Sequence, residues 1–160
     1  MRESGLGLAL DRGYDGAPRR LDVDDLAGRV AGSGYAALVA EYELTPKPGL
    51  VDRRNTGSHR DMDLTSFARS AAAIRPYLAD FVVEGANAAV DPAGAVLERL
   101  RPIGLAAERA MGAATGGVNT HKGAIFGFGL ACGAIGRLVG RGEGLSAETV
   151  CDEVAAIAAG

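Results

Sequence analysis

Two polar segments of the sequence contain most of the residue types that can carry out chemistry. The first runs over residues 45–63 and the second over residues 115–123. Together they hold every histidine and lysine of the protein: His59, His121, Lys47 and Lys122. A hydrophobic core needs neither residue type. Their placement therefore predicts a site for an anionic, phosphorylated small molecule.

The second segment has the features of a phosphate-binding turn. Glycines let the backbone approach a ligand closely, and the free N–H groups at the start of a helix attract an anion. Lys122 adds a positive charge, but it precedes glycine, so the segment is not a Walker A loop. The alternative is an ordinary glycine-rich turn between two helices. The candidate ligand-binding residues here are Gly116, Gly117, Asn119, Thr120, His121 and Lys122.

The first segment combines cations with carboxylates. Arginine forks clamp phosphate oxygens, and magnesium is held by one or two carboxylates together with substrate phosphates. Asp61 and Asp63 are the candidate Mg²⁺ ligands, and His59 gives the run a spacing typical of metal ligands. A solvated loop in which Asp63 caps a helix is the alternative. The candidate phosphate-binding residues of this segment are Lys47, Arg53 and Asn55.

Two further carboxylates are candidates for a general base or a metal ligand. Glu41 stands shortly before the first polar segment, and Glu108 lies in an apolar stretch before the second. A carboxylate inside a site can accept a proton from an attacking hydroxyl group. Each is also compatible with an ordinary ion-paired surface residue, and the sequence leaves both readings open.

Composition limits the class of protein. A chain of 160 residues predicts one domain, and a net charge of −3 argues against a nucleic-acid or anionic-membrane binder. The longest apolar run, residues 123–136, is shorter than a bilayer span, and we find no secretory signal. We expect Cys132 and Cys151 to be buried free thiols, and the protein to be cytoplasmic.

Hydrophobic periodicity predicts an all-α bundle of six or seven helices. The first helix begins at Asp22 and is stopped by Pro46. The second begins at Asp63 or Thr65, and Pro76 kinks or divides it. No segment alternates as a strand does. Residues 1–20 are expected to be a flexible tail, and residues 21–160 a helical domain.

Prolines and caps define the remaining helices. Asp91 is the expected N-cap of one helix, and Pro102 is expected to open another that runs to about Ala114. Asn119 or Thr120 is expected to cap a glycine-rich apolar helix that ends near Val139, which we place at the centre of the bundle. Ser146 caps the last helix.

These motifs, taken together, resemble the triphosphoribosyl-dephospho-coenzyme A synthase family, whose members serve citrate lyase and malonate decarboxylase. The resemblance covers about residues 41–140. It is carried by four stretches in the expected order: Thr45–Asp52, Asn55–His59, Asp61–Asp63 and Thr115–Gly123. It also includes single residues between them: Phe67, Ser70, Gly104, Leu105, Glu108 and Met111.

The resemblance implies an all-helical fold and an unusual ribosyl transfer. The 2′-hydroxyl of 3′-dephospho-CoA would attack C1′ of the ribose of ATP, with adenine as the leaving group. The product would be the prosthetic-group precursor of an acyl-carrier subunit. For this reaction our hypothesis is phosphate binding by Lys47, Arg53 and Lys122, Mg²⁺ binding by Asp61 and Asp63, a base at Glu41 or Glu108, and a proton donor at His121 with His59 behind it.

The sequence also departs from the family. Members are much longer, and a later motif rich in Asn, Ser, Pro, Gly and Asp has no counterpart here. We therefore expect a C-terminally incomplete N-terminal half, and a homo-oligomer that covers its exposed apolar faces. The alternatives are a non-catalytic nucleotide- or CoA-binding half that needs a partner chain, and a metal-dependent phosphohydrolase suggested by His59, Asp61 and Asp63.

Overall fold

The computed structural model describes residues 22–160, and this part of the chain contains five helices and no strand. The all-α class is confirmed, whereas the expected six or seven helices are not found between residues 22 and 160. The predicted tail, residues 1–20, lies outside the described residues. The helices are α1 (Val23–Glu43), α2 (Leu64–Asn87), α3 (Ala93–Thr115), α4 (Lys122–Gly140) and α5 (Ala147–Ala158).

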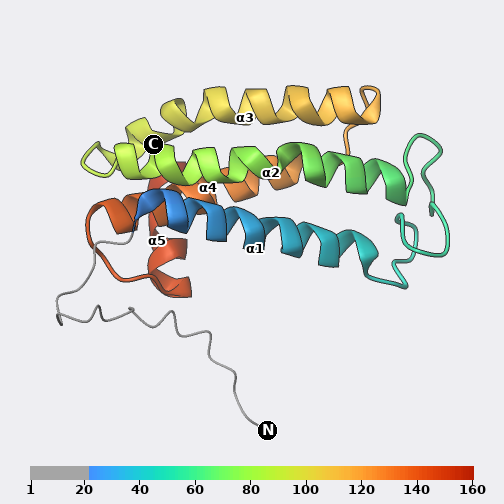
Figure 1. Ribbon diagram of the computed structural model, residues 1–160, viewed down its shortest axis with the longest axis horizontal. Helices are drawn as coiled ribbons and strands as arrows, with labels where there is room; N and C mark the ends of the chain where they lie inside the picture. Colours follow the sequence, from blue (N-terminus) through green and yellow to red (C-terminus); the bar gives the residue numbers. More distant parts are fainter. Residues whose placement is uncertain (1–21) are drawn as a thin grey trace, which may run out of the picture.

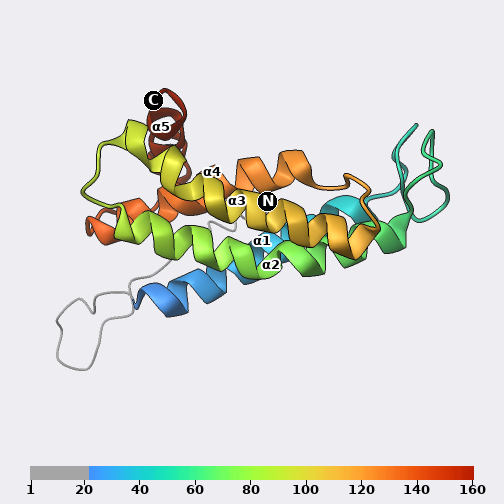
Figure 2. The ribbon, with the colours of Figure 1, turned by 90° about the horizontal axis from the view of Figure 1, so that it is seen from above.

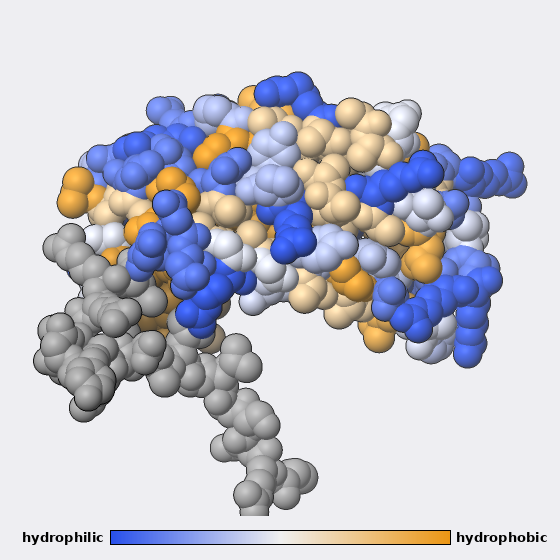
Figure 3. All heavy atoms as spheres, viewed as in Figure 1, coloured by the Kyte–Doolittle hydropathy of each residue, from blue (hydrophilic) through white to orange (hydrophobic). Residues whose placement is uncertain are grey.

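The four long helices lie alongside one another, each antiparallel to the one before it (Figure 1). The shorter α5 lies at one end of this bundle, where α4 leads into it (Figure 2). The α1–α2 and α3–α4 connections lie together at the opposite end, on the right of Figure 1. Figure 3 shows hydrophilic side chains gathered at that end. The topology thus brings the two polar segments to the same end of the molecule.

Two prolines lie inside helices that the sequence predicted them to interrupt. Pro76 lies within α2 and Pro102 within α3, and both helices continue past them. A proline inside a helix costs about 3 kcal/mol. Both prolines are exposed, while Ile74 and Leu78 on either side of Pro76 are buried. Burial of the same apolar face before and after each proline offsets its cost, so two of the expected boundaries are absent.

Two of the predicted N-caps, Asp63 and Ser146, are confirmed. The carboxylate of Asp63 accepts from the backbone N–H of Ser66 at 2.8 Å and forms a capping box with it. Ser146 caps α5 in the same way with Thr149. The prediction for Asp91 is wrong, because the N-cap of α3 is Pro92 and has no side-chain hydrogen bond. The Asp91 carboxylate instead pairs with the guanidinium of Arg99, one and a half turns into α3.

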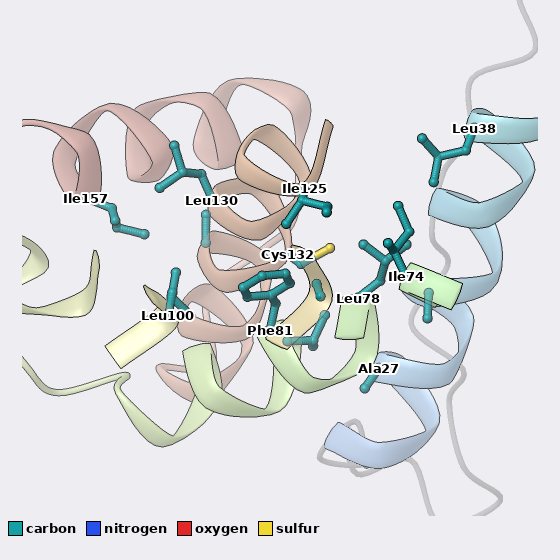
Figure 4. Packing of buried hydrophobic residues seen from close by; sticks show 14 of the residues in the cluster. Ala27, Leu38, Ile74, Leu78, Phe81, Leu100, Ile125, Leu130, Cys132 and Ile157 are labelled. Carbon is teal, nitrogen blue, oxygen red and sulfur yellow. The ribbon is translucent and has the colours of Figure 1, made fainter. Parts of the chain in front are cut away.

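The centre of the bundle is α2 rather than the glycine-rich α4. Helix α2 packs against α1, α3 and α4, and Figure 4 shows its Leu78 and Phe81 between Leu38 of α1 and Leu100 of α3. The expected central position of α4 is not confirmed, since its early turns face solvent and leave the Phe126 side chain 61% exposed.

Glycines bring α2 and α4 into backbone contact. A Cβ atom added at Gly136 would lie 2.0 Å from the carbonyl oxygen of Val82, and one added at Gly85 would lie 2.1 Å from that of Gly133. Such distances exclude any side chain. Close packing through glycine is confined to this half of α4, since a Cβ at Gly123 or Gly127 would meet open space.

An ion-pair network joins α4 to α5. The buried Arg137 guanidinium donates to a carboxylate oxygen of Glu153 at 2.5 Å and to the carbonyl of Ala88 after α2. Arg141 donates to the other carboxylate oxygen of Glu153 at 2.6 Å. These bonds lower the pKa of Glu153, with Arg141 as the largest cause. The network ties the last helix to the bundle.

Helix α4 is long and apolar enough to cross a membrane by itself, but half of the segment that meets this test is buried against the other helices. A core helix of a folded bundle has the same length and apolar character.

The two cysteines differ from each other in burial. Cys132 is buried, which raises the pKa of its thiol to about 12, whereas Cys151 is exposed on α5 and the expectation that it is buried is wrong.

Candidate functional site

A pocket of about 490 Å³ lies where the end of α1, the start of α2 and the start of α4 meet. Three of the predicted site residues line it: Glu41, Thr120 and His121. The remaining lining residues are Ala37, Leu38, Phe67, Gly123, Ala124 and Phe128. The pocket therefore combines apolar walls with a carboxylate, a hydroxyl group and an imidazole, which is the usual make-up of a small-molecule site.

His121 is fixed in this pocket by contacts on several sides. Its side chain is only 5% exposed, and its Nδ1 atom lies 2.7 Å from the Oγ of Ser70 on α2. The Phe67 ring meets the imidazole edge-on, with 5.1 Å between ring centroids. The backbone N–H of His121 donates to the sulfur of Met111 at 3.3 Å. These contacts hold both the ring plane and the backbone of the residue.

Two polar atoms at the pocket are buried without a hydrogen-bond partner in residues 22–160. They are the Nε2 atom of His121 and the Oγ1 atom of Thr120. Buried polar groups in folded proteins almost always have a partner, and each one left without costs about 1–3 kcal/mol. Two such atoms on adjacent residues indicate a place where a ligand completes the hydrogen bonding.

Burial makes His121 an uncharged imidazole at neutral pH. Desolvation lowers its pKa and is the largest effect. The nearby Glu41 carboxylate raises the pKa, and the Lys47 ammonium lowers it. A neutral imidazole has one N–H donor and one lone-pair acceptor, so which nitrogen carries the proton decides what the pocket can bind.

Lys47 lies beside this pocket, at the end of α1. Its side chain is only 10% exposed, and its Nζ donates to the Oε1 of Glu41 at 3.1 Å and to the Glu41 carbonyl at 3.0 Å. The ammonium also lies 6.0 Å from the centre of the Phe67 ring. The structure thus joins Lys47, Glu41 and His121, which the sequence placed in separate segments.

Asp52 shapes the loop that holds Lys47. Its buried carboxylate accepts from the backbone N–H groups of Lys47 at 3.0 Å, Arg54 at 2.7 Å and Asn55 at 3.1 Å. These bonds lower the pKa of the Asp52 carboxyl, and the one from Lys47 contributes most. Sequence reasoning counted Asp52 only as one acidic residue of the segment. An Asp that precedes Asn and Gly in a turn-rich stretch was the signal for this role.

Other predicted residues of the first segment do not reach the pocket. Arg53 pairs with Glu43 at 2.5 Å on the exposed side of the loop. The Asn55 side chain accepts from the N–H of Gly57 at 2.8 Å and so forms part of a turn. His59 lies with its Nδ1 3.8 Å from a carboxylate oxygen of Asp61 and is half-buried in the loop. None of these three lines the pocket around His121.

The proposed Mg²⁺ ligands lie at the end of the loop. The Asp61 side chain is 62% exposed, and one carboxylate oxygen of Asp63 serves as the helix cap. Between residues 22 and 160, no group of three His, Cys, Asp or Glu side chains forms a metal site of its own. The chemistry of two aspartates still fits Mg²⁺, which takes one or two protein carboxylates and completes its shell with phosphates and water.

Glu108 of α3 and Lys122 at the start of α4 form an ion pair apart from the pocket around His121. Their Oε2 and Nζ atoms lie 3.3 Å apart. Glu108 lines a second, mostly apolar pocket of about 150 Å³ between α2, α3 and α4, together with Leu105, Ile125 and Phe126. The two candidate bases, Glu41 and Glu108, therefore lie in different pockets, and only Glu41 shares one with His121.

The turn between α3 and α4 positions Thr120 and His121. Gly116 and Gly117 have φ values of 67° and 92°, which favour glycine, and the Gly117 N–H donates to the carbonyl of Gly112 at 2.8 Å. Asn119 accepts from the N–H of Lys122 at 3.1 Å, although the residue at the N-cap position is His121. These glycines thus have a structural role at the end of α3.

Comparison with known proteins agrees with these observations. Residues 27–159 match the family described as ATP:dephospho-CoA triphosphoribosyl transferase. Curated relatives named probable 2-(5''-triphosphoribosyl)-3'-dephosphocoenzyme-A synthase include one from Salmonella gallinarum, 55% identical over 81% of this chain and 43% of the relative. Another, from Pectobacterium carotovorum, is 48% identical over 95% of this chain and 50% of the relative.

The chain spans about half the length of the curated relatives that it matches. No solved structure matches it. The family match nevertheless covers α2 to α5 completely, most of α1, and every residue of the pocket around His121. The chain therefore belongs to the ATP:dephospho-CoA triphosphoribosyl transferase family.

Proposed function

We propose that this chain binds ATP at the pocket around His121 and takes part in transferring the triphosphoribosyl group to the 2′-hydroxyl of 3′-dephospho-CoA. In this reaction a bond forms between the 2′-oxygen and C1′ of the ribose of ATP, and the bond from C1′ to adenine breaks. The triphosphate stays on the product, which we propose to be the prosthetic-group precursor of an acyl-carrier subunit.

One observation carries this proposal beyond the family match. The unpaired Nε2 of His121 and Oγ1 of Thr120 lie at one pocket beside a carboxylate and an ammonium group. An adenine nucleotide offers ring nitrogens and hydroxyl groups that would pair with the two unpaired atoms. Its phosphates would supply the negative charge that Lys47 attracts.

The chemistry requires a base and a hydrogen-bond donor. Glu41 is our candidate for the base that accepts the proton of the attacking hydroxyl, because it lies in the same pocket as His121. The Nε2 of His121 would donate a hydrogen bond to a ring nitrogen of the leaving adenine, which takes its proton from water. A negative carboxylate beside C1′ also stabilises the positive charge that develops there as adenine leaves.

The triphosphate must be held but not cleaved. Lys47 and Lys122 are the candidate phosphate ligands. Lys47 lies beside the pocket, where it pairs with Glu41, and Lys122 is the first residue of α4, directly after His121. Asp61 and the free oxygen of Asp63 would hold Mg²⁺ together with the phosphates, and the ion would neutralise part of their charge. Glu108 would then act through Lys122, with which it pairs.

The direct test incubates the purified chain with ATP, Mg²⁺ and 3′-dephospho-CoA and measures free adenine by chromatography and the adduct by mass spectrometry. We expect adenine and the triphosphoribosyl adduct in equal amounts. Release of inorganic phosphate without adenine would contradict the transfer and favour the phosphohydrolase.

A second candidate function is a nucleotide-binding half that turns over only with a partner chain. The observation that favours it is the length of the match, which covers 43–50% of the curated relatives named above. Tight ATP binding without adenine release would establish this function instead, provided that adding the second half of a relative in trans restores the release of adenine.

A further inference from the structure

Ser70 is the residue that meets His121 inside the bundle. It lies on α2 with its side chain completely buried, and 51 residues separate it from His121. Its Oγ lies 2.7 Å from the imidazole Nδ1. Within residues 22–160, this is the one hydrogen bond recorded for the Ser70 hydroxyl. The contact does not belong to the helix ladder, so it needs an explanation of its own.

The proton of the Ser70 hydroxyl has one acceptor within the described chain. A hydroxyl on a helix often donates to the carbonyl four residues back, as Thr115 does to Met111 at 2.9 Å. No such bond is found for Ser70 in this part of the protein. If Nδ1 carried the imidazole proton, the Ser70 hydroxyl would accept it and its own proton would be buried without a partner. If Nδ1 carries a lone pair, the hydroxyl donates to it and both groups are satisfied.

We infer that Ser70 is a positioning residue that holds His121 in the tautomer with its proton on Nε2. The Nε2 of His121 then presents an N–H donor at a place where it has no partner in the described chain. The group that completes it must be an acceptor, such as a purine ring nitrogen or a phosphate oxygen. The identity of that acceptor rests on the function proposed above, whereas the tautomer does not.

The surroundings of His121 agree with a neutral, oriented ring. The charged groups that face it are Glu41 at the end of α1 and Lys47 in the following loop, and these two pair with each other. From α2 it meets Phe67 and Ser70, and from α3 Met111, none of which is charged. Burial lowers the pKa of His121, so the imidazole is uncharged at neutral pH, and the contact with Ser70 decides which nitrogen carries its proton.

The tautomer can be measured directly because the protein has only two histidines. We propose long-range ¹H–¹⁵N correlation spectra of the full chain labelled with ¹⁵N-histidine, recorded from pH 5 to pH 9. The His59→Gln variant assigns the signals. Above its pKa, His121 should show a protonated Nε2 and an unprotonated Nδ1. His59, which is half-buried in a loop, should show an average of the two tautomers. A protonated Nδ1 in His121, or the same average as His59, would overturn the inference without any variant of Ser70.

The Ser70→Ala variant tests whether this residue causes the preference. Its His121 signals should move toward the average shown by His59. The matched control is Ser66→Ala, which removes a hydroxyl one turn earlier on the same helix and should leave the His121 signals in place. A folded Ser70→Ala protein that keeps a single Nε2-protonated tautomer would show that another group sets it, and would overturn the role of Ser70.

Kinetics separate this inference from the proposed function. If the chain releases adenine, Ser70→Ala should lower kcat by about tenfold and change the KM for ATP less than threefold. In His121→Asn, which has no Nε2, the further change Ser70→Ala should cost nothing more. If wild-type protein binds ATP but releases no adenine, the transfer is contradicted, and the tautomer measurement still decides the role of Ser70.

Discussion

The ammonium group of Lys47 lies 3.1 Å from the Oε1 of Glu41 and 3.0 Å from the carbonyl oxygen of the same residue. This pair closes the end of α1 beside the pocket. A triphosphate that binds Lys47 would compete with the Glu41 carboxylate for the ammonium group. Nucleotide binding would then free that carboxylate to accept a proton, which couples the arrival of ATP to the appearance of a base.

The first prediction concerns this lysine. Lys47→Ala should weaken ATP binding by about tenfold or more, because it removes the cation proposed to contact a phosphate, which its contacts with Glu41 already hold in position. Isothermal titration with ATP measures the effect. Arg29→Ala removes an exposed cation from the first turns of α1, at the other end of that helix, and is the matched control. Equal affinities for Lys47→Ala and Arg29→Ala would remove Lys47 from the phosphate site, and Lys122→Ala would then test the other lysine.

His121 should matter for turnover more than for binding. His121→Asn keeps an amide near the Nδ1 position beside Ser70 and removes Nε2. We expect kcat for adenine release to fall by about 10²-fold, the usual effect of losing one hydrogen-bond donor to a group that gains negative charge in the transition state, with a small change in the Kd for ATP. His59→Asn compares the other histidine. If the larger loss appears in His59→Asn, the donor is His59 and the assignment to His121 is wrong.

The loop around Asp52 should loosen when its carboxylate loses its charge. The pKa of Asp52 is lowered, mainly by the backbone N–H of Lys47, so its contribution is present above about pH 4 and is lost as the pH falls through the lower folded value. Asp52→Ala should speed tryptic cleavage after Arg53 and Arg54 severalfold at pH 8, as followed by mass spectrometry. Asp61→Asn changes an exposed carboxylate of the same loop and should cleave at the wild-type rate.

Magnesium dependence tests the two aspartates. Asp61→Asn and Asp63→Asn should each raise the Mg²⁺ concentration needed for half-maximal ATP binding by severalfold, because an amide is a weaker ligand than a carboxylate. Asn is as good an N-cap as Asp, so Asp63→Asn should keep α2 intact, which circular dichroism checks. A Mg²⁺ titration of the double variant that matches the wild type would exclude both residues as ligands.

Acid should weaken the attachment of α5. Glu153 has a lowered pKa, so its ion pairs stabilise the fold fully above about pH 4.5 and lose their effect as the pH falls through the folded value. Glu153→Gln should cost about 2 kcal/mol in urea unfolding at pH 7, and less at pH 3. The control Asp152→Asn changes an exposed carboxylate on the same helix. A cost for Glu153→Gln that is the same at both pH values would contradict the role of the charge.

The sequence predicted local features of the fold better than contacts between distant residues. The all-α class, the start of the first helix at Asp22 and the caps at Asp63 and Ser146 follow from signals within a few residues. Helices α2 and α3 have no boundary at Pro76 or Pro102, because a proline signal is local whereas the burial that offsets it comes from the rest of the bundle. The count of helices was therefore too high for residues 22–160.

The candidate site was predicted as two segments rather than as one pocket. His121 and Lys47 could be singled out because these residue types are rare in this chain. The contact of His121 with Ser70 could not be found, since the two residues lie 51 positions apart in the sequence and only the fold brings them together. Asp52 was not distinguished from the other acidic residues of its segment, although its place before Asn55 and Gly57 in a turn-rich stretch was a signal for its role.

The backbone contact between α2 and α4 has a consequence for mutations far from the pocket. Ser70 and His121 each stand 15 residues from a glycine of that contact, Gly85 on α2 and Gly136 on α4. At about 1.5 Å per residue, each arm is roughly 22 Å long. A tilt of only a few degrees at the glycines would displace the far end by about 1 Å, enough to break a hydrogen bond of 2.7 Å. A single methyl group added at Gly85 or Gly136 would thus break the hydrogen bond between Ser70 and His121 in the distant pocket.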